Sequence, residues 1–295
     1  MNFQLVWFTH GDTKLNMNNV KLLGLLSILV FFFGCEELPS ESVVDNPLDP
    51  DNPNYEAPLA TIDSGGGDGD ILLTNSVSFI WSGKNELSQF AYKLEDFDSD
   101  WSDWSSNLEV AYNYLDEGDY IFNVKEKYST GDEQETPTAI SFTVNAIAGP
   151  AFVMKRQLVE INNNNAFAVD VIAEEVDNLL AALIKIEFDT DKLDVLSIDT
   201  AGTSNWSANT DGITFVATSV TDANTNGWME INTTRLGGEP VGMTGTGTVA
   251  TITFTARNTG VTNITFSAGN TCQMRDSNNT NLDINELVLV RVEIN

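Results

Sequence analysis

Apolar residues occupy every second position over much of the chain after residue 58, which is the pattern of β-strands with one buried face. The stretch 167–198 shows this pattern most clearly. Apolar side chains alternate with polar or small ones in 167–172 and again in 184–189, and Leu193 opens a third segment. Residues 178–184 are almost continuously apolar, so their pattern alone leaves helix and strand open, and the flanking strands favour strand. We predict three β-segments joined by two short acidic turns.

Alternating segments also recur between residues 58 and 147. Glycine-rich turn signals such as 65–69 and 116–118 separate them, and short strands at such intervals are typical of a β-sandwich. The segments are Val77–Trp81, Phe90–Leu94, Phe122–Val124 and Ile140–Val144.

A second set of strand patterns follows the hinge 148–150. About nine strands are expected in residues 151–295, which predicts a jelly-roll-like sandwich. The fold class is therefore all-β: an immunoglobulin or fibronectin-III-like sandwich at 58–147, then a nine-stranded jelly-roll sandwich at 151–295.

The charge balance narrows the classes of partner. The chain has 295 residues and a net charge of −29, from 43 acidic and 14 basic residues. The charge balance disfavours nucleic acid and anionic lipid surfaces as partners, because binding phosphate needs lysine and arginine to displace counterions. The ordinary interpretation of the excess is solubility of an exposed protein.

The N-terminal segment has the pattern of a signal peptide. Lys21 precedes an uncharged run, 22–33, whose twelve residues span about 18 Å as a helix, short of the roughly 30 Å hydrocarbon core. We therefore predict a signal peptide at 1–34, with Met17 as the more natural start.

Residues Phe32–Cys35 resemble a bacterial lipobox, although Phe32 stands where the family usually has leucine. The resemblance implies cleavage before Cys35 and lipidation of its thiol, which would make the protein a lipoprotein of the outer membrane in the bacterial cell envelope. The alternative is an ordinary secretory peptide with an incidental cysteine. Glu36 and Glu37 look like the export signal of surface lipoproteins in some bacterial phyla.

A tether follows at 35–57. Five of the chain's eight prolines fall between Pro39 and Pro58, interleaved with Asp and Asn. Proline fixes φ and removes a donor, so we predict a semi-rigid, extended spacer.

The residue inventory argues against an enzyme. His10 is the only histidine and lies before Cys35, so the mature chain would lack Ser–His or Cys–His nucleophiles and histidine-ligated zinc. Cys272 would then be the one remaining thiol and is predicted to be a strand residue. The acids at 96–103 lack the glycine and terminal glutamate of a calcium loop, which favours a solvated turn. No cofactor or metal is expected.

The run FAYKLEDFDSDWSDWSS, followed by LDEGDYIFNV, resembles the immunoglobulin-like module that follows the propeller in bacterial two-component sensors. The module is a relative of fibronectin-III domains. Trp101 and Trp104 are expected to pack in its core, and a sugar-stacking platform is the alternative.

The order of features in 151–295 resembles a cohesin domain. A strand with alternating valines follows a polar turn at 162–165, and Phe188-Asp189 leads through a turn into 193–198. A Gly-rich turn then opens the strand 245–254. The fold is shared with some cellulose-binding modules, so a carbohydrate-binding relative stays open.

This resemblance implies a protein-binding module, because cohesins bind dockerins of polysaccharide-degrading enzymes through one flat sheet face. By alternation, the outward residues on that face are Leu183, Lys185, Glu187, Trp228, Glu230 and Asn232. Many cellulosomal cohesins have Asn and Asp at the positions that align with Ala181 and Leu183, so a more apolar contact is expected here. Trp228 is interpreted either as an interface anchor or as a cap on the core.

We therefore predict a non-enzymatic, lipid-anchored surface adaptor that binds a dockerin-like protein partner. Its membrane attachment would be through the N-terminal lipid alone, and any calcium would belong to the partner. The alternative is a carbohydrate-binding surface lipoprotein in polysaccharide catabolism. A hydrolase is disfavoured because the carboxylates are scattered over turns.

Overall fold

The computed structural model describes residues 46–200, 212–235, 242–267, 269 and 271–295. The chain divides into two compact units, residues 1–56 and 57–295. None of the helices in the described ranges is long and apolar enough to cross a membrane. The predicted signal peptide and Cys35 lie outside the described residues.

The described part of the tether forms a series of turns, so the prediction of an extended spacer is wrong there. Asn46, Asp49 and Asn52 each precede a proline. Their side chains accept the N–H two residues on, at 3.1, 3.0 and 2.8 Å. Their carbonyls accept the N–H three residues on, at 3.0, 2.8 and 2.9 Å. Each turn is thus stabilised in two ways, by the φ angle that proline fixes and by the hydrogen bonds of the Asn or Asp side chain. As a result the backbone turns every three residues.

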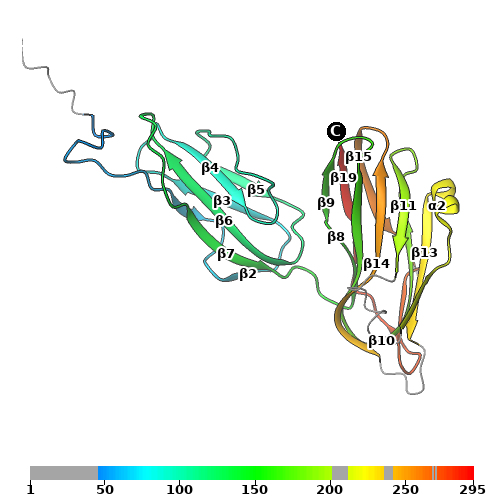
Figure 1. The fold of residues 1–295 in the computed structure, drawn as a ribbon. Coiled ribbons are helices and arrows are strands. Elements are labelled where there is room, and N and C mark those ends of the chain that lie inside the picture. Colours follow the sequence, from blue (N-terminus) through cyan, green and yellow to red (C-terminus); the bar gives the residue numbers. More distant parts are fainter. Residues whose placement is uncertain (1–45, 201–211, 236–241, 268, 270) are drawn as a thin grey trace, which may run out of the picture. The chain divides into compact units, whose positions relative to one another are not determined.

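The first sandwich has a three-stranded sheet of order β1-β3-β5 and a four-stranded sheet of order β2-β7-β6-β4 (Figure 1). The strands are β1 (Thr61–Ser64), β2 (Asp70–Leu72), β3 (Val77–Ser82), β4 (Gln89–Leu94), β5 (Glu109–Tyr112), β6 (Gly118–Lys127) and β7 (Thr138–Val144).

The predicted alternation in these strands is confirmed by their burial. Phe79 and Trp81 on β3 are buried, and Phe79 stacks on Phe122 of the other sheet with ring centroids 3.8 Å apart. Gly65 is required beside them. Its φ is +132°, and a Cβ there would lie 2.2 Å from the Phe79 ring.

The second sandwich has twelve strands and a short helix within the described residues, where about nine strands were predicted. The first strands are β8 (Ala151–Lys155), β9 (Leu158–Ile161), β10 (Ala166–Glu187), β11 (Leu193–Asp199), β12 (Gly212–Val216) and β13 (Trp228–Arg235). The remainder are β14 (Met243–Ala256), β15 (Gly260–Phe266), β16 (Gln273–Asp276), β17 (Asn281–Leu282), β18 (Glu286–Val288) and β19 (Val290–Ile294).

The helix α2 (Val220–Asn226) was not predicted. Ser219 caps its start by accepting the N–H of Asp222, and Gly227 ends it with a φ of 75°. Its seven residues make two turns, which is too short for an apolar stripe to show in the sequence.

The 22-residue strand β10 replaces the first two predicted segments and the acidic turn between them. Glu175 and Asn178 have positive φ values of 47° and 57°, and the register with β14 shifts around them. These irregularities bend the strand without ending it. The first half of β10 pairs with β14 and β8, and the second half pairs with β13 and β16, so β10 passes from one layer of the sandwich to the other (Figure 1).

Both halves of β10 contribute to one core. Phe167, Val169 and Val171 from the first half and Ile184 and Ile186 from the second half belong to the same buried cluster. The predicted fold class, two all-β sandwiches in tandem, is confirmed. The second half of β10 also presents an outer face, on which the predicted contact residues lie.

Candidate functional site

The outer face of the second half of β10 carries the first three predicted site residues. Ile184 and Ile186 have no exposed surface and Phe188 is buried, whereas Leu183 and Lys185 are partly exposed and Glu187 is exposed. The predicted alternation of inward and outward residues on this strand is therefore confirmed. Their role in binding a partner stays a prediction.

Strand β13 places the other three predicted residues beside them. The register pairs Leu183 with Asn232, Lys185 with Glu230 and Glu187 with Trp228. Directly opposed residues in antiparallel strands have Cβ atoms about 4.5–5.5 Å apart and project to the same face. The structure thus brings all six predicted residues together on one sheet surface.

The polar groups of this surface are held in place by one another. The Lys185 ammonium lies over the ring of Trp228, 4.5 Å from its centroid. The Asn232 side chain donates to Glu230 Oε1 at 3.0 Å, and the Ser267 hydroxyl donates to Glu187 Oε1 at 2.5 Å. Trp228 is half-buried and lies outside the core cluster, so it does not cap the core.

Strand β16 adds two side chains that the sequence analysis missed. It pairs with the other edge of β10, opposing Gln273 to Leu183 and Arg275 to Ala181. The alternation in 184–189 could not indicate these residues, because β16 comes about ninety positions later in the chain and is four residues long. The one signal near them was the prediction that Cys272 is a strand residue.

Cys272 lies just before β16 and fixes the backbone beneath this surface. Its sulfur accepts the N–H of Lys185 at 3.4 Å and donates to the Lys185 carbonyl at 3.6 Å. The thiol is buried, and burial raises its pKa above the ordinary range. A buried thiol with a raised pKa is a poor nucleophile. The prediction that Cys272 is a strand residue is wrong, because the residue lies in a bend just before β16.

A hollow of about 300 Å³ lies on this surface where β13, β10 and β16 run side by side. It is lined by Ala181, Ala182, Leu183, Asn232, Thr233, Thr234, Gln273 and Arg275. We refer to it as the Ala181 hollow.

Strand β12 extends the sheet beyond β13. The register opposes Phe215 to Asn232 and Ile213 to Thr234. Ala217, which follows the strand, is exposed. The side chains of Ile213 and Phe215 lie outside the described part of the structure.

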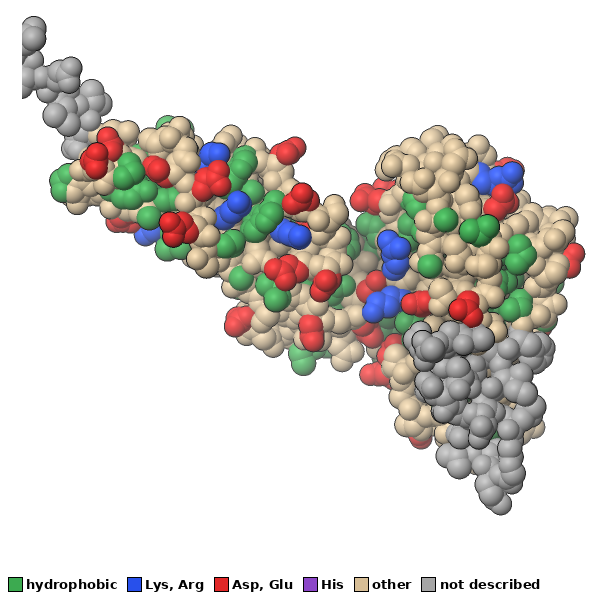
Figure 2. Space-filling model, viewed as in Figure 1, with side chains coloured by type: hydrophobic (Ala, Val, Ile, Leu, Met, Phe, Trp, Pro, Cys, Tyr) green, Lys and Arg blue, Asp and Glu red, His purple; other side chains and the backbone are tan. Residues whose placement is uncertain are grey.

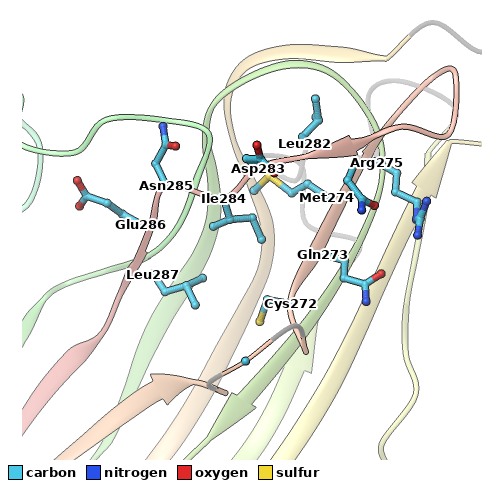
Figure 3. A pocket seen from close by; sticks show the side chains of 12 residues that line it. Cys272, Gln273, Met274, Arg275, Leu282, Asp283, Ile284, Asn285, Glu286 and Leu287 are labelled. Carbon is cyan, nitrogen blue, oxygen red and sulfur yellow. The ribbon is translucent and has the colours of Figure 1, made fainter.

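A larger cleft of about 750 Å³ opens on the opposite edge of β16, between this strand and residues 281–287 (Figure 3). Strands β16 and β17 pair over only two residues, Met274 with Leu282 and Arg275 with Asn281, and the chain then diverges. The cleft lining mixes amide, carboxylate and apolar side chains, including Gln273, Asp283, Ile284, Asn285 and Glu286. Gln273 and Arg275 line both the cleft and the Ala181 hollow.

The first sandwich carries a separate aromatic cluster, and the prediction that Trp101 and Trp104 are core residues is wrong. Both are half-buried and lie outside the core. The ammonium of Lys125 lies 4.9 Å from each ring centroid, and that of Lys127 lies 5.1 Å from the Trp104 ring. The lysines occupy the ring faces that a sugar would need.

This cluster covers the outer side of the β4–β6 pair. The chain returns along β4 through reciprocal hydrogen bonds between Phe90 and Ser105, at 2.7 and 3.0 Å. Ala91 opposes Lys125 in the sheet and is 1% exposed although it points outward. The tryptophans therefore protect a sheet face and are not a free platform.

The acids at 96–103 include one structural residue. Asp98 accepts the N–H of Leu94 at 2.8 Å and the hydroxyl of Tyr112 at 2.6 Å. Burial, followed by the Asp98 carboxylate, raises the pKa of Tyr112 far above its ordinary value. The prediction of a purely solvated turn is wrong for Asp98. Within the described ranges no three His, Cys, Asp or Glu residues are arranged to hold a metal ion.

Comparison with known families supports the assignment of the first sandwich. The sequence model of the Y_Y_Y domain family matches residues 82–145. The predicted propeller-associated, immunoglobulin-like module is thereby confirmed for this part of the chain. No curated protein matches the chain.

Comparison with solved structures concerns the second sandwich. A chain from a type I cohesin–dockerin complex of Clostridium thermocellum is 16% identical, with a TM-score of 0.39, and the match covers 49% of this chain and 98% of that one. The third cohesin of ScaC from Acetivibrio cellulolyticus, solved with a dockerin, is 19% identical (TM-score 0.39; 48% and 98% covered). The non-cellulosomal cohesin of Archaeoglobus fulgidus is 11% identical (TM-score 0.39; 50% and 92% covered). All three are cohesin structures, and cohesin is the family to which the sequence analysis likened the order of features in 151–295.

Proposed function

We propose that this chain is a non-enzymatic surface adaptor whose second sandwich binds a protein partner through the outer face of β13, β10 and β16. The observation that carries the proposal is the set of three facing pairs, Leu183–Asn232, Lys185–Glu230 and Glu187–Trp228, on one sheet surface. A leucine and a tryptophan surrounded by charged and amide groups match the apolar centre and polar rim of protein–protein interfaces. The partner that the cohesin resemblance implies is a dockerin-like module of a secreted polysaccharide-degrading enzyme.

The proposed contact on this chain is made by side chains. The polar groups of the face are already oriented by neighbouring side chains, as in the Asn232–Glu230 hydrogen bond and the stacking of Lys185 on Trp228. Orientation before binding lowers the entropic cost of association. Any calcium dependence is proposed to arise in the partner.

An affinity capture with the immobilised protein tests this function. Secreted proteins of the source bacterium would be passed over the wild type and over a Leu183→Asp/Trp228→Ala variant, with calcium or with a chelator. We expect capture of an enzyme bearing a dockerin-like module, and at least tenfold weaker binding to the variant, because buried aromatic and aliphatic anchors contribute most of the binding energy.

The control is Leu196→Asp, a leucine that is 61% exposed on β11, away from the face. It should bind as the wild type does. Equal loss in the control, or retention of the partner by the face variant, would contradict the proposal.

We also propose that the chain is anchored at the bacterial surface through lipidated Cys35. The support is the uncharged run 22–33 before Gly34-Cys35 and the proline-rich segment that follows. Metabolic labelling with a radioactive fatty acid should mark the wild type and not Cys35→Ser. Labelled Cys35→Ser protein, or unlabelled wild type, would contradict a lipid anchor at this residue.

One observation favours the carbohydrate-binding alternative, the polar cleft beside β16 (Figure 3). Amide and carboxylate groups such as Asn281, Asp283 and Asn285 suit sugar hydroxyls. No aromatic ring is among the lining residues, which weakens this alternative. Affinity electrophoresis in gels that contain soluble glycans tests it, with Asp283→Ala as the cleft variant. Retarded wild type and unretarded variant would favour glycan binding at the cleft.

A further inference from the structure

We propose that the partner inserts one aliphatic side chain into the Ala181 hollow and places a carboxylate against Arg275. This inference rests on the proposed function and adds the chemistry of the recognised segment. It identifies Ala181 and Arg275, neither of which is among the six predicted contact residues, as determinants of specificity.

The hollow exists because a small residue lies between longer ones. Ala181 opposes Thr234 of β13 on one side and Arg275 of β16 on the other. In the next outward row, Leu183 lies between Asn232 and Gln273. The single methyl group of Ala181 therefore leaves a depression whose far wall is the Leu183 side chain.

The size and lining of the hollow suit a single apolar side chain. Its volume of about 300 Å³ is at the lower end of the range for ligand sites. Ala181, Ala182 and Leu183 make its β10 side apolar, and Arg275 is the one titratable residue that lines it. A charged or amide side chain that entered the hollow would lose its hydration and would not regain a full set of hydrogen bonds there. An aliphatic side chain would gain free energy, because its apolar surface is removed from water.

Arg275 supplies the charge complementarity. The hydrogen bonds of its guanidinium within the described residues come from Nη1, to the carbonyl and side-chain oxygens of Asn279 at 3.1 and 3.4 Å. It is in none of the four ion pairs that the described part of the chain contains. In a chain with 43 acidic and 14 basic residues, a guanidinium without a carboxylate partner on this face is unusual. Its remaining donors fit a carboxylate of the partner.

The short distance between Ala181 and Arg275 means that the aliphatic side chain and the carboxylate come from one short segment of the partner. Arg275 lies directly opposite Ala181, so the carboxylate must be within one or two residues of the aliphatic side chain in an extended segment, or three to four in a helix. Lys185, four positions along β10, is about 13 Å away and already stacks on Trp228, so it does not substitute for Arg275.

A phage-displayed library of random dodecapeptides, selected on the whole protein, tests the inference. The variants are Ala181→Trp, which fills the hollow, and Arg275→Glu, which reverses the charge at its rim. The matched controls are Ala168→Trp, at an exposed alanine on β10, and Arg257→Glu, at an exposed arginine that follows β14. Circular dichroism and urea unfolding establish that each variant is folded.

The wild type and both controls should enrich peptides with an aliphatic residue and a nearby Asp or Glu. Ala181→Trp should lower binding of the selected peptides at least tenfold. Arg275→Glu should keep the aliphatic preference and replace the acidic residue by Lys or Arg. Absence of such a motif, a motif that Ala181→Trp still binds equally, or an unchanged charge preference in Arg275→Glu would overturn the inference.

Failure of this inference is distinguishable from failure of the proposed function. If a captured dockerin-like partner loses affinity for Leu183→Asp/Trp228→Ala but binds Ala181→Trp as tightly as the wild type, the face is the docking site and the hollow is not part of it. If the partner binds all variants equally, the proposed function itself is wrong.

Discussion

At the scale of single residues, Glu126 shows where sequence patterns stop being informative. It lies on β6 with no exposed surface, at an inward position in line with Phe122 and Val124. Its carboxylate accepts backbone N–H groups from Leu59 at 2.7 Å and Lys84 at 2.9 Å, so it joins two loops to the sheet. Alternation predicts that position 126 is buried, but the loops that supply its donors are distant in sequence.

We expect Glu126→Gln to lower the free energy of unfolding by about 2–3 kcal/mol, because an amide –NH₂ would replace a charged acceptor that faces several N–H groups. Urea unfolding followed by tryptophan fluorescence measures this. Glu135→Gln, at an exposed position, should change stability by less than about 0.5 kcal/mol. Equal effects of the two substitutions would show that the Glu126 hydrogen bonds contribute little.

Tyr120 provides a pH-dependent prediction. Burial, then the nearby Asp116 charge, raises its pKa to about 12, and its hydroxyl donates to the Asp116 carbonyl at 2.9 Å. The folded-state pKa is above the unfolded value of about 10, so the stabilisation from the neutral phenol is complete below pH 10. It is lost as the pH rises through about 12. Unfolding free energies measured from pH 9 upward should fall less steeply in Tyr120→Phe than in the wild type, and parallel curves would contradict this.

At the scale of elements, β10 was predicted in part. The alternation at 184–189 gave the inward and outward residues of its second half, because a strand with one buried face carries that information locally. Four of the five residues Glu174–Asn178 are polar, which is the composition of a turn, yet in the structure the segment is bulged strand that pairs with β14 on one side. Whether polar residues end a strand or bend it depends on pairing partners that the local sequence does not show. The position of β16 beside β10 likewise depends on a pairing partner that is distant in the sequence. The alternation pattern therefore did not place Gln273 and Arg275 on this face.

Asn178 is the residue on which the second bend of β10 depends. Its φ is 57°, its side-chain oxygen accepts the N–H of Gly242 at 3.0 Å, and its Nδ2 donates to Ser277 at 2.8 Å. Asn178→Ala should cost about 2–3 kcal/mol, from two lost hydrogen bonds and from the left-handed conformation that alanine disfavours.

Asn178→Gly separates these two causes. Glycine adopts positive φ at no steric cost, so this variant should be about 1 kcal/mol more stable than Asn178→Ala in urea unfolding. A glycine variant less stable than the alanine variant would mean that the bend does not require the left-handed conformation.

At the scale of the whole molecule, charge is the property that the sequence defines most fully. Acidic side chains outnumber basic ones over the visible surface (Figure 2), as the net charge of −29 requires. The described ion pairs involve lysines and arginines at N···O distances of 2.7–3.8 Å, and their side chains are between 23% and 53% exposed. Such exposed pairs contribute about 0–1 kcal/mol each. The four ion pairs of the described residues involve three carboxylates, Glu133, Asp194 and Glu293. With 43 acidic residues in the chain, repulsion among carboxylates should outweigh attraction in the folded state.

We therefore expect added salt to stabilise this protein. Raising the ionic strength from about 0.01 M to 0.15 M shortens the screening length from about 30 Å to 8 Å, which weakens the long-range repulsion more than the short contacts. A gain of about 1 kcal/mol corresponds to a rise of about 2–4 °C in the melting temperature of a protein of this size. Calorimetry in sodium chloride and in tetramethylammonium chloride measures this rise and separates screening from cation binding. Equal rises of the melting temperature in the two salts indicate screening, and a rise with sodium alone indicates a specific cation site. A fall of the melting temperature in both salts would mean that the exposed ion pairs dominate the electrostatics of the fold.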